Sequence, residues 1–182
     1  MRIIAGSRKG HKLRPIKGLA IRPTTDRVRE SIFNILGSVV LDAVVLDLYA
    51  GTGGMGIEAL SRGAAFTLFV EKNPYSVQTI TRNLGHLKLT NQSRVAKRDV
   101  LKGLSWLETL GHRFNVVFMD PPYEKNYVAR TLSFLSQADI FSSEPRIIAE
   151  HSVKEAVPES VGDLVLYDQR TYGKIMVSFY ER

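Results

Sequence analysis

Short apolar runs alternate along the chain with longer segments in which apolar residues recur at helical spacing. The apolar runs cover residues 44–49, 66–71, 93–97, 115–119 and 146–150, and each is typical of a buried strand. The segments 54–61, 74–87, 100–110 and 127–135 have the pattern and length of helices. Strands that alternate with helices predict a parallel sheet with helices on both faces, which is a doubly wound, Rossmann-like α/β fold.

The end of the chain follows a different pattern. Residues 163–169 and 174–181 each resemble a strand, but only residues 170–173 separate them. A connection this short cannot hold a crossover helix, so we expect the two strands to pair as an antiparallel hairpin. The predicted sheet is therefore mostly parallel, has seven strands and ends in a hairpin.

A further helix is predicted before the first strand. Beyond Pro23, with Thr24 or Thr25 as the N-cap, one face of this helix collects apolar residues, namely Val28, Ile32, Ile35, Leu36 and Val39. The predicted organisation is a basic N-terminal arm and helix over residues 1–40, followed by one α/β domain over residues 41–182.

Charge is concentrated at the N-terminus. The chain has a formal net charge of +7 and a pI of about 9.7, and residues 1–30 carry nine Lys/Arg against two acids. The rest of the chain is balanced, so the arm is the predicted contact with a polyanion. Apolar residues such as Ile3, Leu13 and Ile16 are interleaved with the charges, which favours an ordered surface. The candidate nucleic-acid contacts are Arg2, Arg8, Lys9, Lys12, Arg14, Arg22, Thr24 and Arg27.

Composition excludes several classes of protein. There is no cysteine, which rules out disulfides, thiolate zinc sites and a cysteine nucleophile. The four histidines are scattered, so we expect no metal site. Asp42 and Asp47 interrupt the richest apolar run, which predicts no membrane helix, and the first residues lack the apolar core of a signal peptide. We therefore expect a cytoplasmic protein.

A glycine-rich loop follows the first predicted strand. Residues 51–56 read G-x-G-x-x-G, and Glu71 ends the next strand, where an acid that binds ribose is expected. A dinucleotide is one possible ligand of this loop. Asp47 favours a different adenosine cofactor, because a carboxylate suits a cationic amino-acid group better than a phosphate. Asp99 follows the third strand and is suited either to accept from an adenine amine or to cap a helix.

A second loop, Asp120-Pro121-Pro122-Tyr123, follows the fourth strand. The two prolines stiffen it and leave the Asp120 side chain and the Pro121 carbonyl as a rigid acceptor array beside an aromatic ring. A base amine is a poor nucleophile, because its lone pair is delocalised into the ring. Such an array activates it by holding its N–H bonds, while Tyr123 stacks on the extruded base.

In combination, the segments DLYAGTGGMG, FVEKNP, RDV and DPPY resemble class I S-adenosylmethionine-dependent methyltransferases that act on amino groups. The segments RIIAGSRKGHKLRP and RPTTDRVRESIFNIL extend the resemblance to the RsmD family, which methylates the exocyclic N2 of one guanine in 16S ribosomal RNA. The resemblance implies Asp120, Pro121, Pro122 and Tyr123 as the target-amine site. It implies that the cofactor contacts are Asp47, Tyr49, Gly51, Thr52, Gly53, Glu71, Lys72, Asn73, Asp99 and Val100.

Several alternatives remain at this point. An NAD-dependent oxidoreductase would explain the glycine loop but not the Asp-Pro-Pro-Tyr loop, and a non-catalytic RNA-binding module would explain only the arm. Methyltransferases acting on adenine N6, in RNA or DNA, share the amine-site motif, so guanine follows from the resemblance alone. The expected partner is 16S ribosomal RNA in an assembled or assembling small subunit, bound by a monomer. The sequence does not decide whether Arg22, Thr24 and Arg27 contact the cofactor or the RNA.

Overall fold

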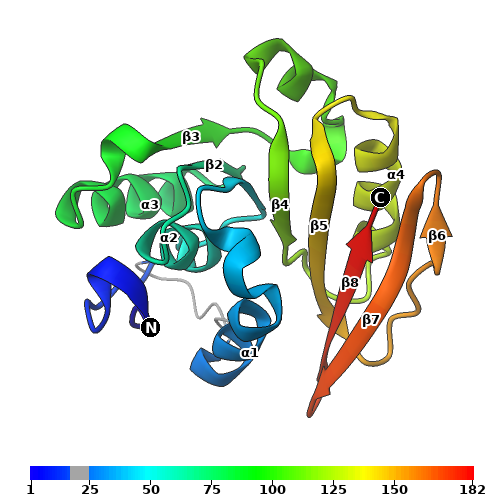
Figure 1. Cartoon of the computed structure of the whole chain (residues 1–182), viewed down its shortest axis with the longest axis horizontal. Coiled ribbons are helices and arrows are strands. Elements are labelled where there is room, and N and C mark those ends of the chain that lie inside the picture. The colour runs from blue at the N-terminus through cyan, green and yellow to red at the C-terminus, as the bar shows by residue number, and fades with distance from the viewer. Residues whose placement is uncertain (17–24) are drawn as a thin grey trace.

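The computed structural model describes residues 1–16 and 25–182, and in that part of the chain one sheet of eight strands forms the centre (Figure 1). The strand order is β3-β2-β1-β4-β5-β8-β7-β6. Parallel pairing joins the first five strands in that order, which are β3 (Ser93–Lys97), β2 (Phe66–Glu71), β1 (Val44–Leu48), β4 (Phe114–Met119) and β5 (Phe141–Ser152). The expected fold class is confirmed.

The C-terminal strands extend this sheet in the antiparallel sense. β8 (Ile175–Glu181) pairs with β5 on one side and with β7 (Leu164–Tyr172) on the other, which confirms the predicted hairpin. The strand count is one higher than expected, because the short β6 (Ser160–Val161) adds to the edge beyond β7. Two residues are too short a run to give a periodic signal in the sequence.

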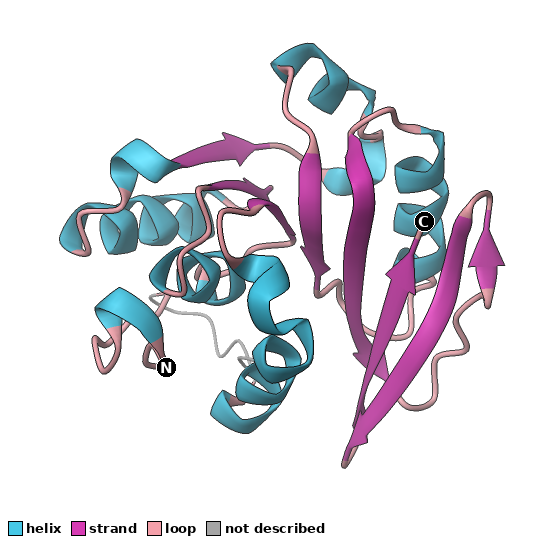
Figure 2. Ribbon diagram, viewed as in Figure 1, coloured by secondary structure: helices cyan, strands magenta, loops and turns pink. Residues whose placement is uncertain are grey.

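Helices cover both faces of the sheet (Figure 2). One face packs against α1 (Asp26–Leu36), α2 (Gly54–Ser61) and α3 (Pro74–His86), with η2 (Gly37–Val40) following α1. The opposite face packs against η4 (Val100–Lys102), η5 (Ser105–Leu110) and α4 (Tyr127–Gln137). Neighbouring strand residues alternate between the two cores, as Val45 and Leu46 do. The remaining short helices are η1 (Gly6–Arg8) and η3 (Thr90–Gln92).

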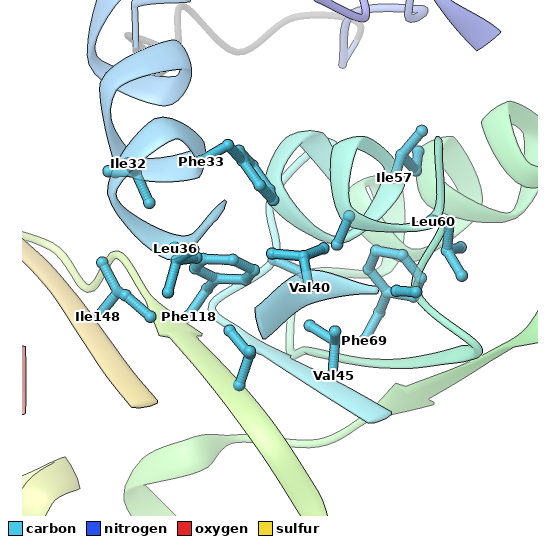
Figure 3. Packing of buried hydrophobic residues seen from close by; sticks show 14 of the residues in the cluster. Ile32, Phe33, Leu36, Val40, Val45, Ile57, Leu60, Phe69, Phe118 and Ile148 are labelled. Atoms are coloured by element: carbon cyan, nitrogen blue, oxygen red, sulfur yellow. The ribbon is translucent and has the colours of Figure 1, made fainter. Parts of the chain in front are cut away.

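Two details of the helix predictions were wrong. The buried stripe of α1 is Val28, Arg29, Ile32, Phe33 and Leu36, whereas Ile35 is 38% and Val39 40% exposed. The i, i+3, i+4 spacing carries the stripe past Arg29 and Phe33 rather than past Ile35. Figure 3 shows Phe33 directed toward the sheet among the side chains of the first core.

The second wrong prediction is the single helix over residues 100–110. Two short 3₁₀ segments, η4 and η5, stand in its place. Gly103 has φ +96° between them, a left-handed backbone that cannot continue a right-handed helix. The apolar spacing that suggested a helix is retained, because Leu104 and Leu107 are both buried against the second face.

The N-terminal segment, residues 1–16, is folded onto α2 and α3. Arg2 and Lys12 form an antiparallel bridge, and Ile3 and Leu13 belong to the same core as α1. In Figure 1 this segment lies beside α2, and η1 contacts α2. In the part of the chain that the structure describes, no helix is long and apolar enough to cross a membrane.

Candidate active site

A cavity of about 590 Å³ lies at the carboxyl edge of β1, β2 and β4, beside β5. This is the edge at which doubly wound sheets bind ligands, and the volume suits a ligand of nucleoside size. The cavity brings together both predicted loops. Most of the candidate residues line it, namely Asp47, Tyr49, Gly51, Thr52, Glu71, Lys72, Asn73, Asp99, Val100 and Asp120–Tyr123, whereas Gly53 does not.

The glycine loop is folded by left-handed turns and close packing. Gly51 has φ +55° and Gly53 has φ +81°, conformations that glycine adopts without strain, and the Gly53 N–H donates to the Ala50 carbonyl over 2.7 Å. Gly56 serves packing, because a Cβ placed there would lie 2.4 Å from Cε1 of Phe69. The loop therefore brings the start of α2 close to the sheet and directs its backbone at the cavity.

Asp47 is a strongly perturbed acid of the site. It is 3% exposed, and its Oδ2 accepts from the Gly56 N–H over 2.9 Å, which ties β1 to the first turn of α2. Burial raises the pKa of the Asp47 carboxyl from 3.8 to about 8, against the Gly56 hydrogen bond, and the nearby Glu71 charge raises it further. A cation delivered by a ligand would stabilise the ionised form of this group.

The carboxylate of Glu71 supports the glycine loop. It accepts from the Gly51 N–H over 2.9 Å and from the Asn73 N–H over 2.8 Å. Asn73 in turn caps α3, since its Oδ1 accepts from the Tyr75 N–H over 2.9 Å. A carboxylate accepts up to about four hydrogen bonds, so Glu71 retains capacity for hydroxyl groups of a ligand in the cavity.

The acid after β3 forms the helix cap that the sequence offered as one of two alternatives, and it lies at the cavity. Asp99 caps η4 by accepting from the Leu101 N–H over 3.1 Å, and it also lines the cavity. Lys72 lies 3.7 Å from its Oδ2, and the neighbouring Val100 is buried in the cavity wall.

Tyr49 and Thr52 help to fix the loop in place. The Tyr49 hydroxyl lies 2.7 Å from Oγ1 of Thr131 in α4, and burial raises the pKa of Tyr49 to about 12. The Thr52 carbonyl accepts from Nδ2 of Asn83 over 3.2 Å. The Arg14 N–H donates to Oδ1 of Asn83 over 2.9 Å, so Asn83 connects the glycine loop to the N-terminal segment.

The Asp120–Tyr123 loop leaves β4 on the opposite side of the cavity from the loop after β2. Tyr123 is 37% exposed, and its hydroxyl donates to Oε1 of Glu150 over 2.6 Å. Glu150 lies inside β5, is 5% exposed and lines the cavity. The hydrogen bond fixes the ring of Tyr123 relative to the sheet.

The basic residues of the N-terminal part divide into three groups. Arg2 and Arg8 have protein partners: Arg2 pairs with Asp26 over 3.3 Å, and Nε of Arg8 donates to the Leu87 carbonyl over 2.9 Å. Arg14 lines the cavity, while the side chains of Lys9, Lys12 and Arg27 are exposed. Arg22 and Thr24 lie outside the described residues.

Among the residues of the cavity wall to which sequence reasoning assigned no site role are Met1, Arg29 and Glu150. Arg29 is 1% exposed, and its Nη2 donates to Oδ1 of Asp26 over 3.0 Å and to the Arg2 carbonyl. Its Nη1 and Nε are buried without a hydrogen-bond partner, and Nη1 would lie 3.4 Å from a Cβ on Gly54. An arginine within a helical apolar stripe, between Val28 and Ile32, was the available signal.

No group of three or more His, Asp or Glu side chains suited to a metal ion occurs within residues 1–16 and 25–182. The doubly wound sheet and the cavity at its carboxyl edge are the features expected from the resemblance to class I S-adenosylmethionine-dependent methyltransferases. The same fold occurs in an RNA methyltransferase from Salinibacter ruber solved in complex with S-adenosyl-L-homocysteine, with a TM-score of 0.66, 16% identity, and coverage of 87% of this chain and 92% of that one.

Comparison with known families is more specific. The family model described as "Conserved hypothetical protein 95" matches residues 1–181. The chain is 39% identical to YlbH of Bacillus subtilis, provisionally named an rRNA methyltransferase, over 100% of this chain and 99% of that protein. It is 35% identical to ribosomal RNA small subunit methyltransferase D of Escherichia coli, over 100% of this chain and 90% of that protein.

A solved structure agrees with these matches. The Escherichia coli protein yhhF, provisionally named a methyltransferase, superposes with a TM-score of 0.86 at 36% identity, over 100% of this chain and 97% of that one. The chain belongs to the RsmD family of ribosomal RNA methyltransferases.

Proposed function

We propose that this protein transfers a methyl group from S-adenosylmethionine to the exocyclic N2 of one guanine in 16S ribosomal RNA of the small subunit. The observation that carries the proposal is that the glycine loop and the Asp120–Tyr123 loop line one continuous cavity. The full-length similarity to small subunit methyltransferase D supports the choice of RNA.

The polar groups of the cavity fit this cofactor better than a dinucleotide. Asp47 is a buried acid that gains from a cation, and Arg29 presents buried donors that gain from an anion. Both line the cavity near the start of α2, so together they match the ammonium and carboxylate of an amino acid. A pyrophosphate would bring negative charge to Asp47 and satisfy only Arg29. Glu71 and Asp99 are the proposed acceptors for the ribose hydroxyls and the adenine amine.

When bound, S-adenosylmethionine supplies an electrophilic methyl group on a sulfonium. We assign to Asp120 and the Pro121 carbonyl the task of accepting the two N2 hydrogens, which orients the nitrogen lone pair toward the methyl carbon. The N2–C bond forms as the C–S bond breaks, and the electron pair of that bond stays on sulfur. The surplus proton of N2 passes to the Asp120 carboxylate and then to water. Tyr123 stacks on the extruded base, while Pro122 keeps the loop rigid.

The proposed RNA surface continues from the cavity over the N-terminal segment. The exposed side chains of Lys9, Lys12 and Arg27 are free to reach phosphates, and Arg14 lies where this surface meets the cavity. Arg2 and Arg8 contribute charge while also holding the segment in place. Contacts of this kind orient a protein on RNA without reading sequence.

The decisive experiment is transfer of labelled methyl from S-adenosylmethionine to small ribosomal subunits from cells that lack this protein, followed by nucleoside analysis. We expect N2-methylguanosine at one site. N6-methyladenosine would instead identify adenine as the target base. No incorporation of methyl, together with binding of NAD, would indicate that the glycine loop binds a dinucleotide.

A further inference from the structure

Two carboxylates lie side by side where the target base is expected. β4 and β5 are parallel, and their last printed register pair is Met119 with Ala149. Asp120 and Glu150 are the residues that directly follow this pair, and residues paired on neighbouring parallel strands lie about 5 Å apart. Both residues line the cavity. β4 ends at Met119 whereas β5 continues to Ser152, which places Glu150 beside the first residue of the Asp120–Tyr123 loop.

Glu150 is expensive to bury and is retained there with a specific contact. It is 5% exposed, and a carboxylate removed from water needs hydrogen-bond donors to offset its lost hydration. Tyr123 provides one through its hydroxyl, over 2.6 Å. Glu150 also lines the cavity, which is where a donor group of a ligand would arrive.

We propose that Glu150 selects guanine by accepting its N1–H while Asp120 and the Pro121 carbonyl hold the N2 amine. This inference rests on the proposed function and refines it. Guanine presents N1–H and N2–H₂ next to each other on its Watson–Crick edge, a row of donors that matches two adjacent carboxylates. Adenine presents an N1 lone pair at the corresponding position, which would face the negative charge of Glu150 without a proton between them.

The same contact assists the reaction. A hydrogen bond from N1–H to a carboxylate shifts electron density from N1 into the ring and onto the C2 amine, which makes N2 a better nucleophile. Glu150 thereby contacts the base directly, and its hydrogen bond to Tyr123 holds the stacking ring next to the Watson–Crick edge that Glu150 recognises.

The test compares RNA substrates that carry guanine or 2-aminopurine at the methylated position. Both bases have the C2 amine, but N1 of 2-aminopurine has a lone pair and no hydrogen. We expect the wild-type protein to prefer guanine in kcat/KM by about 10- to 100-fold, because a hydrogen bond to a charged group is lost. Glu150→Gln should reduce this preference at least about tenfold, since its amide is able to donate to the N1 lone pair.

Tyr123→Phe is the matched control. It removes the hydroxyl that contacts Glu150 but leaves the carboxylate, so it should lower turnover on both bases while the guanine preference persists. The loss of O6 in 2-aminopurine affects every variant equally, so the comparison between variants isolates N1. Affinity for S-adenosyl-L-homocysteine, measured by calorimetry, should be the same in both variants and the wild type.

An unchanged guanine preference in Glu150→Gln, with both rates reduced alike, would overturn the proposal and make Glu150 only a positioning residue for Tyr123. In that case the effect of Glu150→Gln would also vanish in a Tyr123→Phe background. Production of N2-methylguanosine by the wild-type protein in the same experiment would leave the proposed function intact. Failure of the wild-type protein to methylate guanine N2 would contradict both the proposed function and the role of Glu150.

Discussion

Two buried acids on the same face of the sheet, Glu58 and Asp47, differ in how many hydrogen-bond donors the protein gives them. Glu58, in α2 beneath the N-terminal segment, accepts from the N–H groups of Ile4 over 2.8 Å and Ala5 over 3.0 Å, and from Nε of Arg62 over 2.8 Å. Asp47, at the cavity, accepts from the Gly56 N–H, and burial raises its pKa to about 8. The protein supplies Glu58 with its donors and leaves Asp47 in need of a positive partner.

Both acids are buried, so burial alone does not distinguish them, and the difference lies in the donors that the protein gives each one. We call the surroundings of Glu58 beneath the N-terminal segment the closed region and the cavity around Asp47 the open region, and Arg29 belongs to both. Its Nη2 faces Asp26 and the Arg2 carbonyl in the closed region, and its unpartnered Nη1 lies toward Gly54 at the cavity. We expect changes in the closed region to alter stability and changes in the open region to alter ligand binding.

The largest effect is expected from Asp120→Ala, which removes an acceptor from the open region. Methyl transfer to small subunits should fall by about 10³-fold, the scale of losing one pre-organised electrostatic contact. Calorimetry with S-adenosyl-L-homocysteine should give an affinity within about twofold of wild type, because the proposed cofactor contacts lie on other strands. Joint loss of both properties would show that the loop is only structural.

Glu58→Ala should damage stability instead. It leaves two backbone N–H groups without their acceptor and removes the carboxylate that lies 3.8 Å from Nε of the buried Arg29, a change that costs about 3 kcal/mol. Urea unfolding measures this loss. Glu58→Gln, which keeps one acceptor oxygen, should lose less, and equal losses in the two variants would contradict the assignment of Glu58 as a hydrogen-bond hub.

Arg29→Lys tests the part of Arg29 that faces the cavity. It keeps a positive charge near Glu58 but removes Nη1, so affinity for S-adenosyl-L-homocysteine should fall about 10- to 100-fold. Affinity for 5′-methylthioadenosine, which lacks the amino-acid group, should not change. Arg62→Lys is the control, because Arg62 contacts the same Glu58 but is not part of the cavity wall. If Arg29→Lys weakened the binding of both ligands equally, Arg29 would not contact the carboxylate of the amino-acid group.

The raised pKa of Asp47 gives the open region a pH dependence. In the folded protein the carboxyl titrates near pH 8, whereas its ordinary value is 3.8. Pairing with an ammonium requires the ionised form, so affinity for S-adenosyl-L-homocysteine should rise from pH 6 toward pH 8 by up to about tenfold per pH unit. Asp47→Asn should abolish this slope.

The sign for stability is opposite. A folded-state pKa above the unfolded value means that the stabilising contribution of Asp47 is full below about pH 4 and is lost as the pH rises toward 8. The unfolding free energy of Asp47→Asn relative to wild type should therefore increase between pH 5 and pH 8. A difference that stays constant across this range would show that Asp47 is ionised throughout.

The smallest effect concerns the outer surface of the N-terminal segment. Lys9→Ala with Lys12→Ala should weaken RNA binding a few-fold and reduce the slope of log affinity against log salt by about one per lost phosphate contact. These exposed side chains are a cleaner test than deletion of the segment, which would also remove Ile3 and Leu13 from the core. An unchanged salt slope would exclude this face from RNA contact.

Most of the fold and the two loops could be predicted because their signals are local. The glycines at positions 51, 53, 54 and 56 allow a sharp turn, and the prolines at 121 and 122 restrict the backbone. Apolar periodicity indicates which residues are buried. The role of Glu150 depends on the register between β4 and β5, and the unpartnered Nη1 of Arg29 depends on which helix face is buried. Tertiary packing decides both, and a linear pattern contains neither.

The N-terminal segment has a consequence for how the protein is made. Its hydrogen bonds join Ile4 to Glu58 and Arg8 to Leu87, so its partners are synthesised 54 and 79 residues after it. Residues 1–16 leave the ribosome before α2 and α3 and reach their final contacts only after both helices have been made, because such long loops must close before their contacts form. The wall of the cavity that Met1 and Arg14 provide is completed only when α2 and α3 have folded.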